Sequence, residues 1–282
     1  MIIWLASYPK SGNTWIRIFI SNIINSKKND YNDPFRFLDD IAAYPNIRQY
    51  SGLVKDNYNV NEIVPNWIRS QDIINLKKGI KIFKTHNMLG SFGKYNFTDL
   101  NNTAGVIYIV RDPRNVVTSL KNHFELDSIK TAEKFILAKN NWLYASKNKN
   151  SGVLPNFCSS WNMHYLSWKS FPKNYLLIKY EDLIKNPMNE IVKIYNYLKK
   201  FYDLSLKNED LIKIVNFSSF EKLKKKENEE GFDESLEDKE RNKKIPFFNS
   251  GPSNDWKKDL DESVRYEIEK EFSKEMRELG YL

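Results

Sequence analysis

The sequence predicts an α/β fold in which a central parallel sheet is flanked by helices. Short apolar runs at residues 1–7, 105–110 and 175–180 are typical of strands buried in a parallel sheet. Segments with the helical spacing of apolar residues follow these runs, so strands and helices alternate along the chain. Polar residues come directly after each run, and ligands bind at the carboxyl ends of the strands in such a sheet. A chain of 282 residues can bury one large core, and we expect a single domain over residues 1–282.

The first apolar run leads directly into a loop and then into a helix. The loop reads Tyr8-Pro9-Lys10-Ser11-Gly12-Asn13-Thr14-Trp15, and the helical spacing begins near Asn13. The free N–H groups of the helix point into the loop, Lys10 adds a positive charge, and Gly12 permits close approach of a ligand. This pattern predicts a phosphate or sulfate site, although a plain strand-to-helix turn is the alternative. The ATP and GTP loop G-x-x-x-x-G-K-[ST] is absent because the lysine precedes the glycine.

The rest of the chain continues the alternation after an irregular insert at residues 25–78, a kind of segment that often carries binding surfaces. The elements that the pattern predicts are, in order, a helix over residues 63–76, a strand over 80–84, a strand over 105–110, a helix over 115–124, a helix over 161–168, a strand over 175–180 and a helix over 188–200. A last helix is expected where Asp259 and Glu262 have the spacing of a capping box, and Gly280 suits its end.

Composition limits the class of protein. Hydrophobic residues make up 41% and aromatic residues 14% of the chain, which is typical of a globular protein. No apolar run is long enough to cross a bilayer, and the first predicted strand begins at Met1, so we expect a cytoplasmic protein. Cys158 is the single cysteine, which excludes an internal disulfide. The three histidines show no metal-ligand spacing, so no metal is expected, and His123 and His164 are assigned to packing or to the surface.

The formal net charge of +8 favours an acidic partner, which is nucleic acid, an anionic membrane or a polyanionic small molecule. The densest basic runs, Lys222 to Lys226 and Arg241 to Lys244, flank an acidic run that includes Glu227 and Glu234. Mixed signs at that density predict a solvated loop or helix face rather than a binding site.

Four side chains at predicted strand ends suggest chemistry. If Lys10, Lys84, His86 and Arg111 converge on one edge of the sheet, they form an anion site with a titratable base beside it. An imidazole accepts a hydroxyl proton near neutral pH, and lysines stabilise charge that develops on a transferred or leaving group.

These residues carry a resemblance to a known family. The loop from Tyr8 to Trp15 resembles the 5′-phosphosulfate loop of the cytosolic-type sulfotransferases, usually Y-P-K-[SA]-G-[TN]-T-W. Further likenesses follow in the family's order: Lys84-Thr85-His86 to the K-T-H element, residues 110–119 to the 3′-phosphate segment, Ser160-Trp161 with His164 and Trp168 to S-W-x-x-H-x-x-x-W, residues 180–183 to Y-E-D-[LM], Ser218-Ser219-Phe220, and Asp255-Trp256-Lys257. The resemblance extends from residue 1 to about residue 260 and implies a P-loop nucleotide-binding-like fold.

The resemblance implies transfer of a sulfonate from 3′-phosphoadenosine 5′-phosphosulfate (PAPS) to an acceptor hydroxyl or amine, leaving 3′-phosphoadenosine 5′-phosphate (PAP). It gives His86 the role of base, and Lys84 with Lys10 that of stabilising the transferring sulfonate and its leaving oxygen. The implied cofactor-binding residues are Lys10, Ser11, Gly12, Asn13, Thr14, Trp15, Arg111, Ser119, Tyr180, Ser218, Phe220 and Gly251.

One part of the family pattern is missing. Where the family has R-K-G-x-x-G-D-W-K, this chain has Asn249-Ser250-Gly251 before residues 252–257, so both basic residues are absent. A lost charge-assisted hydrogen bond costs about 1.5 to 3 kcal/mol, and we expect weaker cofactor binding unless Arg241, Lys243 or Lys244 compensates. The family's dimerisation pattern is not matched after Lys257, so the oligomeric state stays open.

Two other classes of function remain as alternatives. A P-loop kinase of a small molecule needs a magnesium-binding carboxylate, for which Asp112 is the candidate, but the G-K-[ST] ending is absent. A nonenzymatic nucleic-acid-binding protein would explain the basic charge, but the chain shows no aromatic RNA-binding signature or basic recognition helix. We therefore expect a small-molecule partner and no nucleic acid. Phe124 and aromatic residues of the insert are expected to line an acceptor pocket around His86, and phenol, alcohol, amine, carbohydrate and peptide acceptors all stay open.

Overall fold

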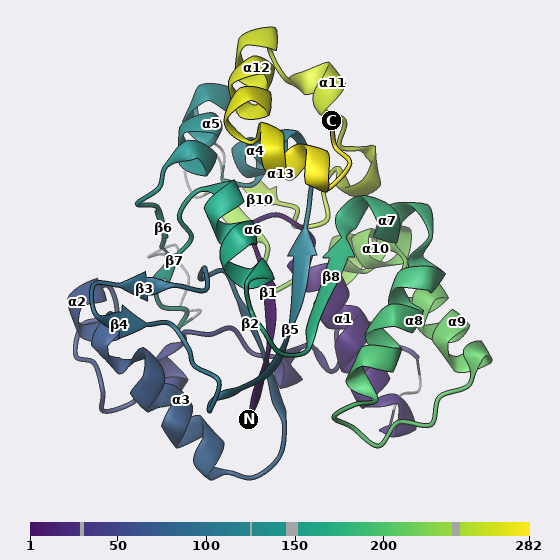
Figure 1. The fold of residues 1–282 in the computed structure, drawn as a ribbon. Helices are drawn as coiled ribbons and strands as arrows, with labels where there is room; N and C mark the ends of the chain where they lie inside the picture. Colours follow the sequence, from purple (N-terminus) through teal and green to yellow (C-terminus); the bar gives the residue numbers. More distant parts are fainter. Residues whose placement is uncertain (29–30, 125, 145–151, 239–242) are drawn as a thin grey trace.

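A parallel sheet lies at the centre of the computed structural model (Figure 1), which describes residues 1–28, 31–124, 126–144, 152–238 and 243–282. For residues 236–238, 243 and 244 the description covers the backbone only. The four strands of this sheet are β1 (Ile2–Ser7), β2 (Lys81–Thr85), β5 (Thr103–Val110) and β8 (Tyr175–Lys179). They pair in the order β2-β1-β5-β8, and all three pairings are parallel, so their carboxyl ends meet at one edge.

Helices and small hairpins surround the sheet. The α-helices are α1 (Asn13–Ile24), α2 (Val60–Ile63), α3 (Trp67–Leu76), α4 (Pro113–His123), α5 (Ile129–Leu137), α6 (Trp161–Lys169), α7 (Tyr180–Lys185), α8 (Pro187–Leu198), α9 (Asn208–Phe217), α10 (Phe220–Glu230), α11 (Trp256–Asp259), α12 (Glu262–Glu271) and α13 (Ser273–Glu278). Single 3₁₀ turns are η1 (Ser26–Lys28), η2 (Leu38–Asp40), η3 (Ile47–Gln49), η4 (Val64–Asn66) and η5 (Gly251–Ser253). Three antiparallel pairs complete the fold: β3 (Ser91–Phe92) with β4 (Tyr95–Asn96), β6 (Trp142–Leu143) with β7 (Asn156–Phe157), and β9 (Leu236–Asp238) with β10 (Lys243–Ile245).

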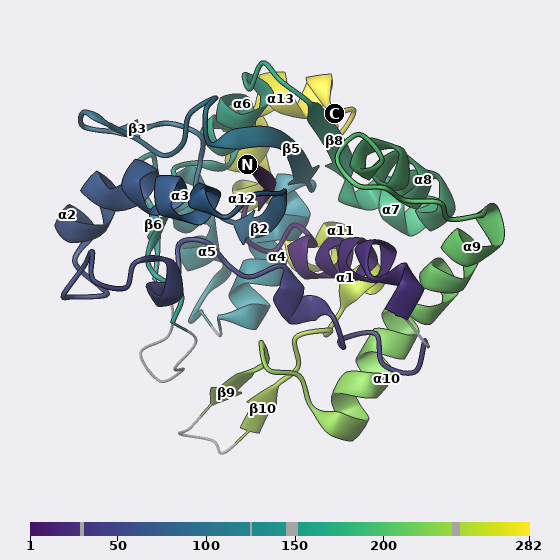
Figure 2. The ribbon, with the colours of Figure 1, turned by 90° about the horizontal axis from the view of Figure 1, so that it is seen from below.

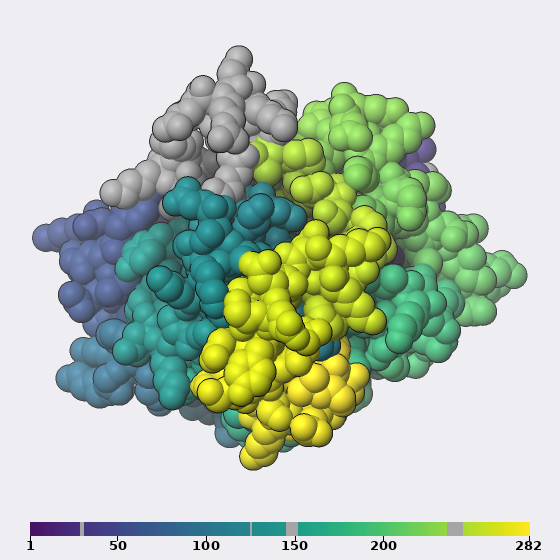
Figure 3. Space-filling model, turned by 90° about the horizontal axis from the view of Figure 1, so that it is seen from above, coloured from purple at the N-terminus to yellow at the C-terminus, as the bar shows by residue number. Residues whose placement is uncertain are grey.

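The two faces of the sheet bury two separate apolar layers. Side chains alternate along each strand, so Trp4 and Tyr108 enter one layer while Leu5 and Ile107 enter the other. Helices α4, α5, α6, α12 and α13 contribute to the first layer, and α1, α7, α8 and α9 contribute to the second. The C-terminal segment covers the first side, and Figure 3 shows it (yellow) between the teal middle of the chain and the green segment near residue 200.

The predicted elements are confirmed with one exception. The expected strands and the helices after them lie within a few residues of the predicted ranges, and Trp161, His164 and Trp168 of α6 are buried together. The last helix was predicted as one element capped at Asp259, which is wrong. Asp259 ends α11, the next helix begins after Asp261, and a break at Phe272 separates α12 from α13. The side chain of Phe272 is fully buried, so packing in the first layer places it rather than helical spacing.

Three further observations bear on the sequence-based expectations. Cys158 is buried with a free thiol, and burial raises its pKa. Within the described ranges, no helix is both long and apolar enough to cross a membrane. Seen from below, α10 and the β9–β10 hairpin lie at the lower side of the view, away from β5 (Figure 2).

Candidate active site

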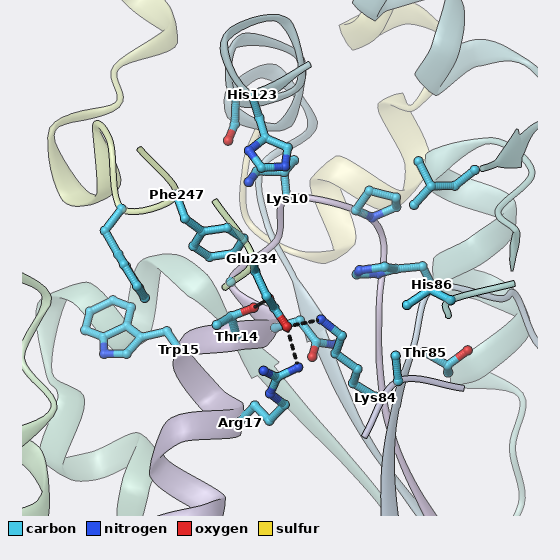
Figure 4. Close-up of a pocket in the computed structure, with 18 of the residues that line it drawn as sticks. Lys10, Thr14, Trp15, Arg17, Lys84, Thr85, His86, His123, Glu234 and Phe247 are labelled. Atoms are coloured by element: carbon cyan, nitrogen blue, oxygen red, sulfur yellow. Dashed lines mark hydrogen bonds and ion pairs between the residues drawn. The ribbon is translucent and has the colours of Figure 1, made fainter. Parts of the chain in front are cut away.

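A cavity of about 790 Å³ opens at the carboxyl ends of the strands. Its wall joins the loop after β1, the residues after β2, Arg111 after β5, one side of α4, and residues 246–251. Figure 4 shows these side chains converging, with Trp15 at one end and His86 at the other. The four predicted chemical side chains, Lys10, Lys84, His86 and Arg111, all line this cavity, as the strand ends predicted.

The loop after β1 is tightly constrained. Lys10 and Gly12 have φ angles of 65° and 95°, and a Cβ atom on Gly12 would lie 2.5 Å from Cδ2 of Tyr180. Gly12 is therefore required both by its conformation and by the closeness of Tyr180. The side-chain amide of Asn13 donates to the carbonyl of Leu5 and the hydroxyl of Ser7, so it fastens the loop to β1.

Aromatic rings form one end of the cavity. The ring of Trp15 meets Tyr180 and Phe220 edge to face, with both centroid distances 6.1 Å, and its Nε1 donates to the carbonyl of Ser218 at 2.8 Å. Gly251 packs directly on this group, because a Cβ there would lie 2.0 Å from Cζ of Phe220. A flat apolar ligand part suits this end of the cavity.

Arg111 links the loop to the aromatic end. Its Nη1 donates to the carbonyl of Lys10 at 2.9 Å, and its guanidinium lies 4.2 Å from the centre of the Tyr180 ring. Ser119 lines the cavity from α4, whereas Ser11 and Ser218 are fully buried and do not line it. Within the part of the chain that the structure describes, Nε of Arg111 and the hydroxyls of Ser11 and Ser218 are buried without a hydrogen-bond partner. Buried polar groups without partners next to a cavity indicate a polar ligand.

His86 is held as a neutral base at the other end. Its Nδ1 lies 2.8 Å from the carbonyl oxygen of Ser7, which can only accept, so Nδ1 carries the proton and Nε2 keeps its lone pair. Burial lowers the pKa of His86 to about 4, although the hydrogen bond to Ser7 opposes the shift and Lys84 adds to it. The imidazole is therefore neutral at neutral pH, and its Nε2 is able to accept a proton.

His164 supports His86 from behind, a role that the sequence did not reveal. It was assigned to packing or to the surface, and it is fully buried. The hydroxyl of Tyr108 lies 2.9 Å from its Nδ1, and its Nε2 lies 3.1 Å from the carbonyl oxygen of His86. Since that carbonyl accepts, His164 donates from Nε2 and receives from Tyr108, which fixes the backbone of His86 relative to β5.

Lys10 is an unusual lysine because the protein around it lowers the pKa of its ammonium group. Burial lowers the pKa of Lys10 to about 7, and the nearby charge of Arg111 lowers it further, while Glu234 opposes the shift. Its Nζ lies 4.4 Å from the centre of the Phe247 ring, which covers it. An anionic ligand in the cavity would favour the charged form of this lysine.

A carboxylate that the sequence did not predict lies in the middle of the cavity. Glu234 accepts from Arg17 at 2.8 Å, from Lys84 at 2.7 Å and from the hydroxyl of Thr14 at 3.0 Å (Figure 4). Burial alone would raise the pKa of Glu234, but Lys84 and Arg17 hold it well below its ordinary value. The prediction that this acidic run is a solvated face is therefore wrong for Glu234, and also for Glu227, which is 7% exposed.

The side of the cavity near Asn249 lacks the expected basic residues. Asn249, Ser250 and Gly251 line it, and Nζ of Lys224 donates to the carbonyl of Asn249 at 2.9 Å. Of the three candidates for compensation, Arg241 lies outside the described residues, and the structure describes only the backbone of Lys243 and Lys244.

Asp112, the magnesium ligand that the kinase alternative requires, has other partners in the structure. Asp112 caps α4, and both of its oxygens accept from Arg114, at 3.0 Å from Nε and 2.7 Å from Nη2. Arg114 is in turn paired with Glu269 of α12. Asp112 therefore stabilises the start of α4 and holds Arg114 in place. Among the described residues, no group of three or more His, Cys, Asp or Glu side chains is placed to hold a metal ion.

The cavity around His86 is more polar than predicted. Phe124 lines it as expected, and Tyr44 comes from the insert, but Asn46 and Arg48 of the insert line it as well. His123 also lines the cavity, and its ring lies 5.6 Å from that of Phe247. The prediction that His123 is only a packing or surface residue is therefore wrong. Arg17, Glu234 and Phe247 are the main site residues that sequence reasoning missed. The helical spacing of Arg17 from Thr14 is the one signal that pointed to any of them.

Comparison with known proteins gives consistent results. The model of the sulfotransferase domain matches residues 2–280. Sulfotransferase 2A1 of Rattus norvegicus is 28% identical over 284 residues, which cover 96% of this chain and 83% of that protein. The 3-beta-hydroxysteroid sulfotransferase of Cavia porcellus is 26% identical over 275 residues, which cover 96% of this chain and 82% of that one.

Solved structures show the same fold. The crystal structure of mouse sulfotransferase SULT7A1 complexed with PAP has a TM-score of 0.60 at 19% identity, over 98% of this chain and 84% of that chain. Retinol dehydratase in complex with androsterone and inactive cofactor PAP also has a TM-score of 0.60 at 19% identity, over 98% of this chain and 80% of that chain.

Proposed function

This chain belongs to the sulfotransferase family, and on that premise we propose that it transfers a sulfonate from PAPS to a hydroxyl or amine of a small-molecule acceptor. One observation carries the proposal. The anion-binding loop of Lys10 to Thr14 and the neutral base His86 line the same cavity, and Lys84 lines it with them. We further propose that residues 1–282 form a single sulfotransferase domain, and a cytoplasmic location stays a prediction from the sequence.

The donor would lie along the strand edge. In this proposal the 5′-phosphosulfate meets Lys10, Gly12, Thr14 and the N–H groups that begin α1, with Ser11 and Asn13 shaping the loop. The adenine enters between Trp15, Tyr180 and Phe220, with Gly251 and Ser218 behind the rings. The 3′-phosphate meets Arg111 and Ser119. The unpartnered Nε of Arg111, which lines the cavity, fits such a ligand.

The chemistry follows from the protonation states. Nε2 of His86 takes the proton from the acceptor hydroxyl as its oxygen attacks sulfur in line with the departing phosphate oxygen. One S–O bond forms to the acceptor, the S–O bond to the phosphate of PAPS breaks, and PAP leaves with the electron pair. Charged Lys10 and Lys84 stabilise the negative charge that grows on the departing oxygen.

The acceptor class is proposed from the relatives and from the wall of the cavity. The relative of Cavia porcellus is named as a 3-beta-hydroxysteroid sulfotransferase, so an alcohol of similar size is the first candidate. Asn46 and Arg48 distinguish this cavity from a purely apolar one and favour an acceptor with a polar group away from its reacting hydroxyl.

Thermal unfolding tests the donor assignment. PAP at a concentration well above its Kd should raise the melting temperature, while ATP with magnesium should not, since a ligand that binds only the folded state stabilises it. A shift with ATP and magnesium, and none with PAP, would favour the kinase alternative.

A further inference from the structure

We propose that Thr14, Arg17 and Lys84 form an oxyanion subsite of the donor site, which Glu234 fills in the donor-free chain and must leave when the 5′-phosphosulfate binds. The inference rests on the proposed function and extends it in two ways. It adds Arg17 as a donor-binding residue, and it makes Glu234 a built-in competitor of the donor.

The three donors converge on one point. Nη1 of Arg17 and Nζ of Lys84 contact the same oxygen, Oε1 of Glu234, at 2.8 and 2.7 Å, and Oγ1 of Thr14 contacts Oε2 at 3.0 Å. Arg17 follows Thr14 by three residues on α1, so both side chains lie on the same side of that helix. Lys84 reaches the same point from β2. The carboxylate therefore occupies the place that these groups would offer to a phosphate or sulfonate oxygen.

The charges favour a more negative occupant than Glu234. Two cations share one carboxylate, and the side chains of Arg17 and Lys84 are only 5% and 16% exposed. Nε of Arg17 is buried and makes no hydrogen bond to any residue that the structure describes. A phosphosulfate brings more negative charge and more acceptor oxygens to the same point.

Glu234 also comes from a segment that can release it. It belongs to the cover segment, by which we mean the described residues 231–238 and 243–248 between α10 and η5. Gly231 begins the segment with a φ of 84°, and nothing lies within 4 Å of the position that an added Cβ would take there. The segment is anchored separately by Glu227 of α10, which accepts from the hydroxyl of Ser235 and from the backbone N–H groups of residues 247 and 248. Rotation of the Glu234 side chain would take its carboxylate out of the subsite while this anchor stays in place.

Substitution of Glu234 tests the inference. Glu234→Gln removes the competing charge but keeps the size of the side chain, and Glu229→Gln is the matched control, since Glu229 is exposed on α10 and pairs only weakly with Lys225. By calorimetric titration, PAP should bind Glu234→Gln about tenfold more tightly than it binds the unchanged chain and Glu229→Gln. An unchanged or weaker affinity for PAP in Glu234→Gln would overturn the role of Glu234 as a competitor.

A second variant tests Arg17. In the Glu234→Gln background, Arg17→Met should weaken PAP binding by about tenfold or more, because a buried cation then no longer meets the phosphate. Arg17→Lys in that background should recover part of the loss. If Arg17→Met binds PAP as tightly as its parent, Arg17 is not a donor-binding residue.

Inorganic sulfate separates this inference from the proposed function. Sulfate should raise the melting temperature of Glu234→Gln more than that of Glu229→Gln, because only the first variant has the subsite free. If neither protein binds PAP but sulfate still distinguishes them, the proposed donor is wrong and the subsite stands. If both bind PAP equally and sulfate does not distinguish them, the donor stands and the subsite is wrong. The same melting curves show whether each variant is folded.

Discussion

Two regions of the cavity are held in place by different means. The strand edge, with Lys10, Lys84, His86 and Arg111, is fixed by the parallel ladder of the sheet and by hydrogen bonds to backbone carbonyls. The cover segment, which supplies Glu234 and Phe247, contacts the cavity residues through side chains: Glu234 pairs with Arg17 and Lys84, and the ring of Phe247 lies against Lys10. In our proposal the edge holds the reacting groups in a constant arrangement, while Glu234 of the cover segment competes with the donor for its subsite.

The largest expected effect concerns the edge. His86→Ala should lower the rate of sulfonate transfer by about 10² to 10⁴, the usual contribution of a general base. PAP affinity should change little, because His86 lies at the end of the cavity away from Trp15 (Figure 4). Rates under saturating donor and a PAP titration measure the two quantities. Retained transfer activity would exclude His86 as the base.

The loop after β1 should be nearly as sensitive. In Gly12→Ala the new Cβ would have to fit 2.5 Å from the Tyr180 ring at a φ of 95°, so PAP affinity should fall by about tenfold or more. Gly79→Ala is the matched control, because Gly79 has a φ of 101° and nothing within 4 Å of the added Cβ. In both variants an alanine must adopt a positive φ, which is unfavourable. Equal PAP affinities in the two would therefore show that the closeness of Tyr180 to Gly12 is unimportant for donor binding.

Adding a positive charge near Gly251 should change the affinity for PAP. Asn249→Arg places a cation where the family has one, and PAP should bind about tenfold more tightly if the 3′-phosphate lies there. The gain should vanish for a nucleotide without the 3′-phosphate. An equal gain for both nucleotides would mean that the new arginine acts elsewhere.

The smallest expected effect is the dependence of PAP affinity on the protonation state of Lys10. Its pKa of about 7 in the donor-free chain means that part of the population is neutral near pH 7, and a bound anion favours the charged form. PAP binding should therefore take up protons, and PAP affinity should fall a few-fold as the pH rises above about 7. Titration calorimetry in buffers of different ionisation enthalpy measures the uptake. Proton release at the same pH would contradict the assignment.

The sequence sufficed for residues whose position follows from a strand end or a short continuous motif. Lys10, Gly12, Lys84, His86 and Arg111 belong to this group, because a parallel sheet brings its carboxyl ends together whatever lies between them.

The rest depended on contacts between distant segments. Glu234 lies 220 residues from Thr14 along the chain, and in sequence it is one acid among several in a mixed-charge run. Local composition does not reveal where such a run will pack, so it resembled a solvated surface. The division of the last helix at Phe272 has the same cause, since packing against Trp161 overrides its helical spacing.

The most direct test of the account is a transfer assay with PAPS labelled on sulfur, offered to hydroxysteroids, phenols and other small alcohols. The account predicts that label appears in an acceptor together with an equal amount of PAP, and that both form about 10² to 10⁴ times more slowly with His86→Ala. Tight PAP binding without transfer to any acceptor class, or transfer from ATP instead, would contradict it.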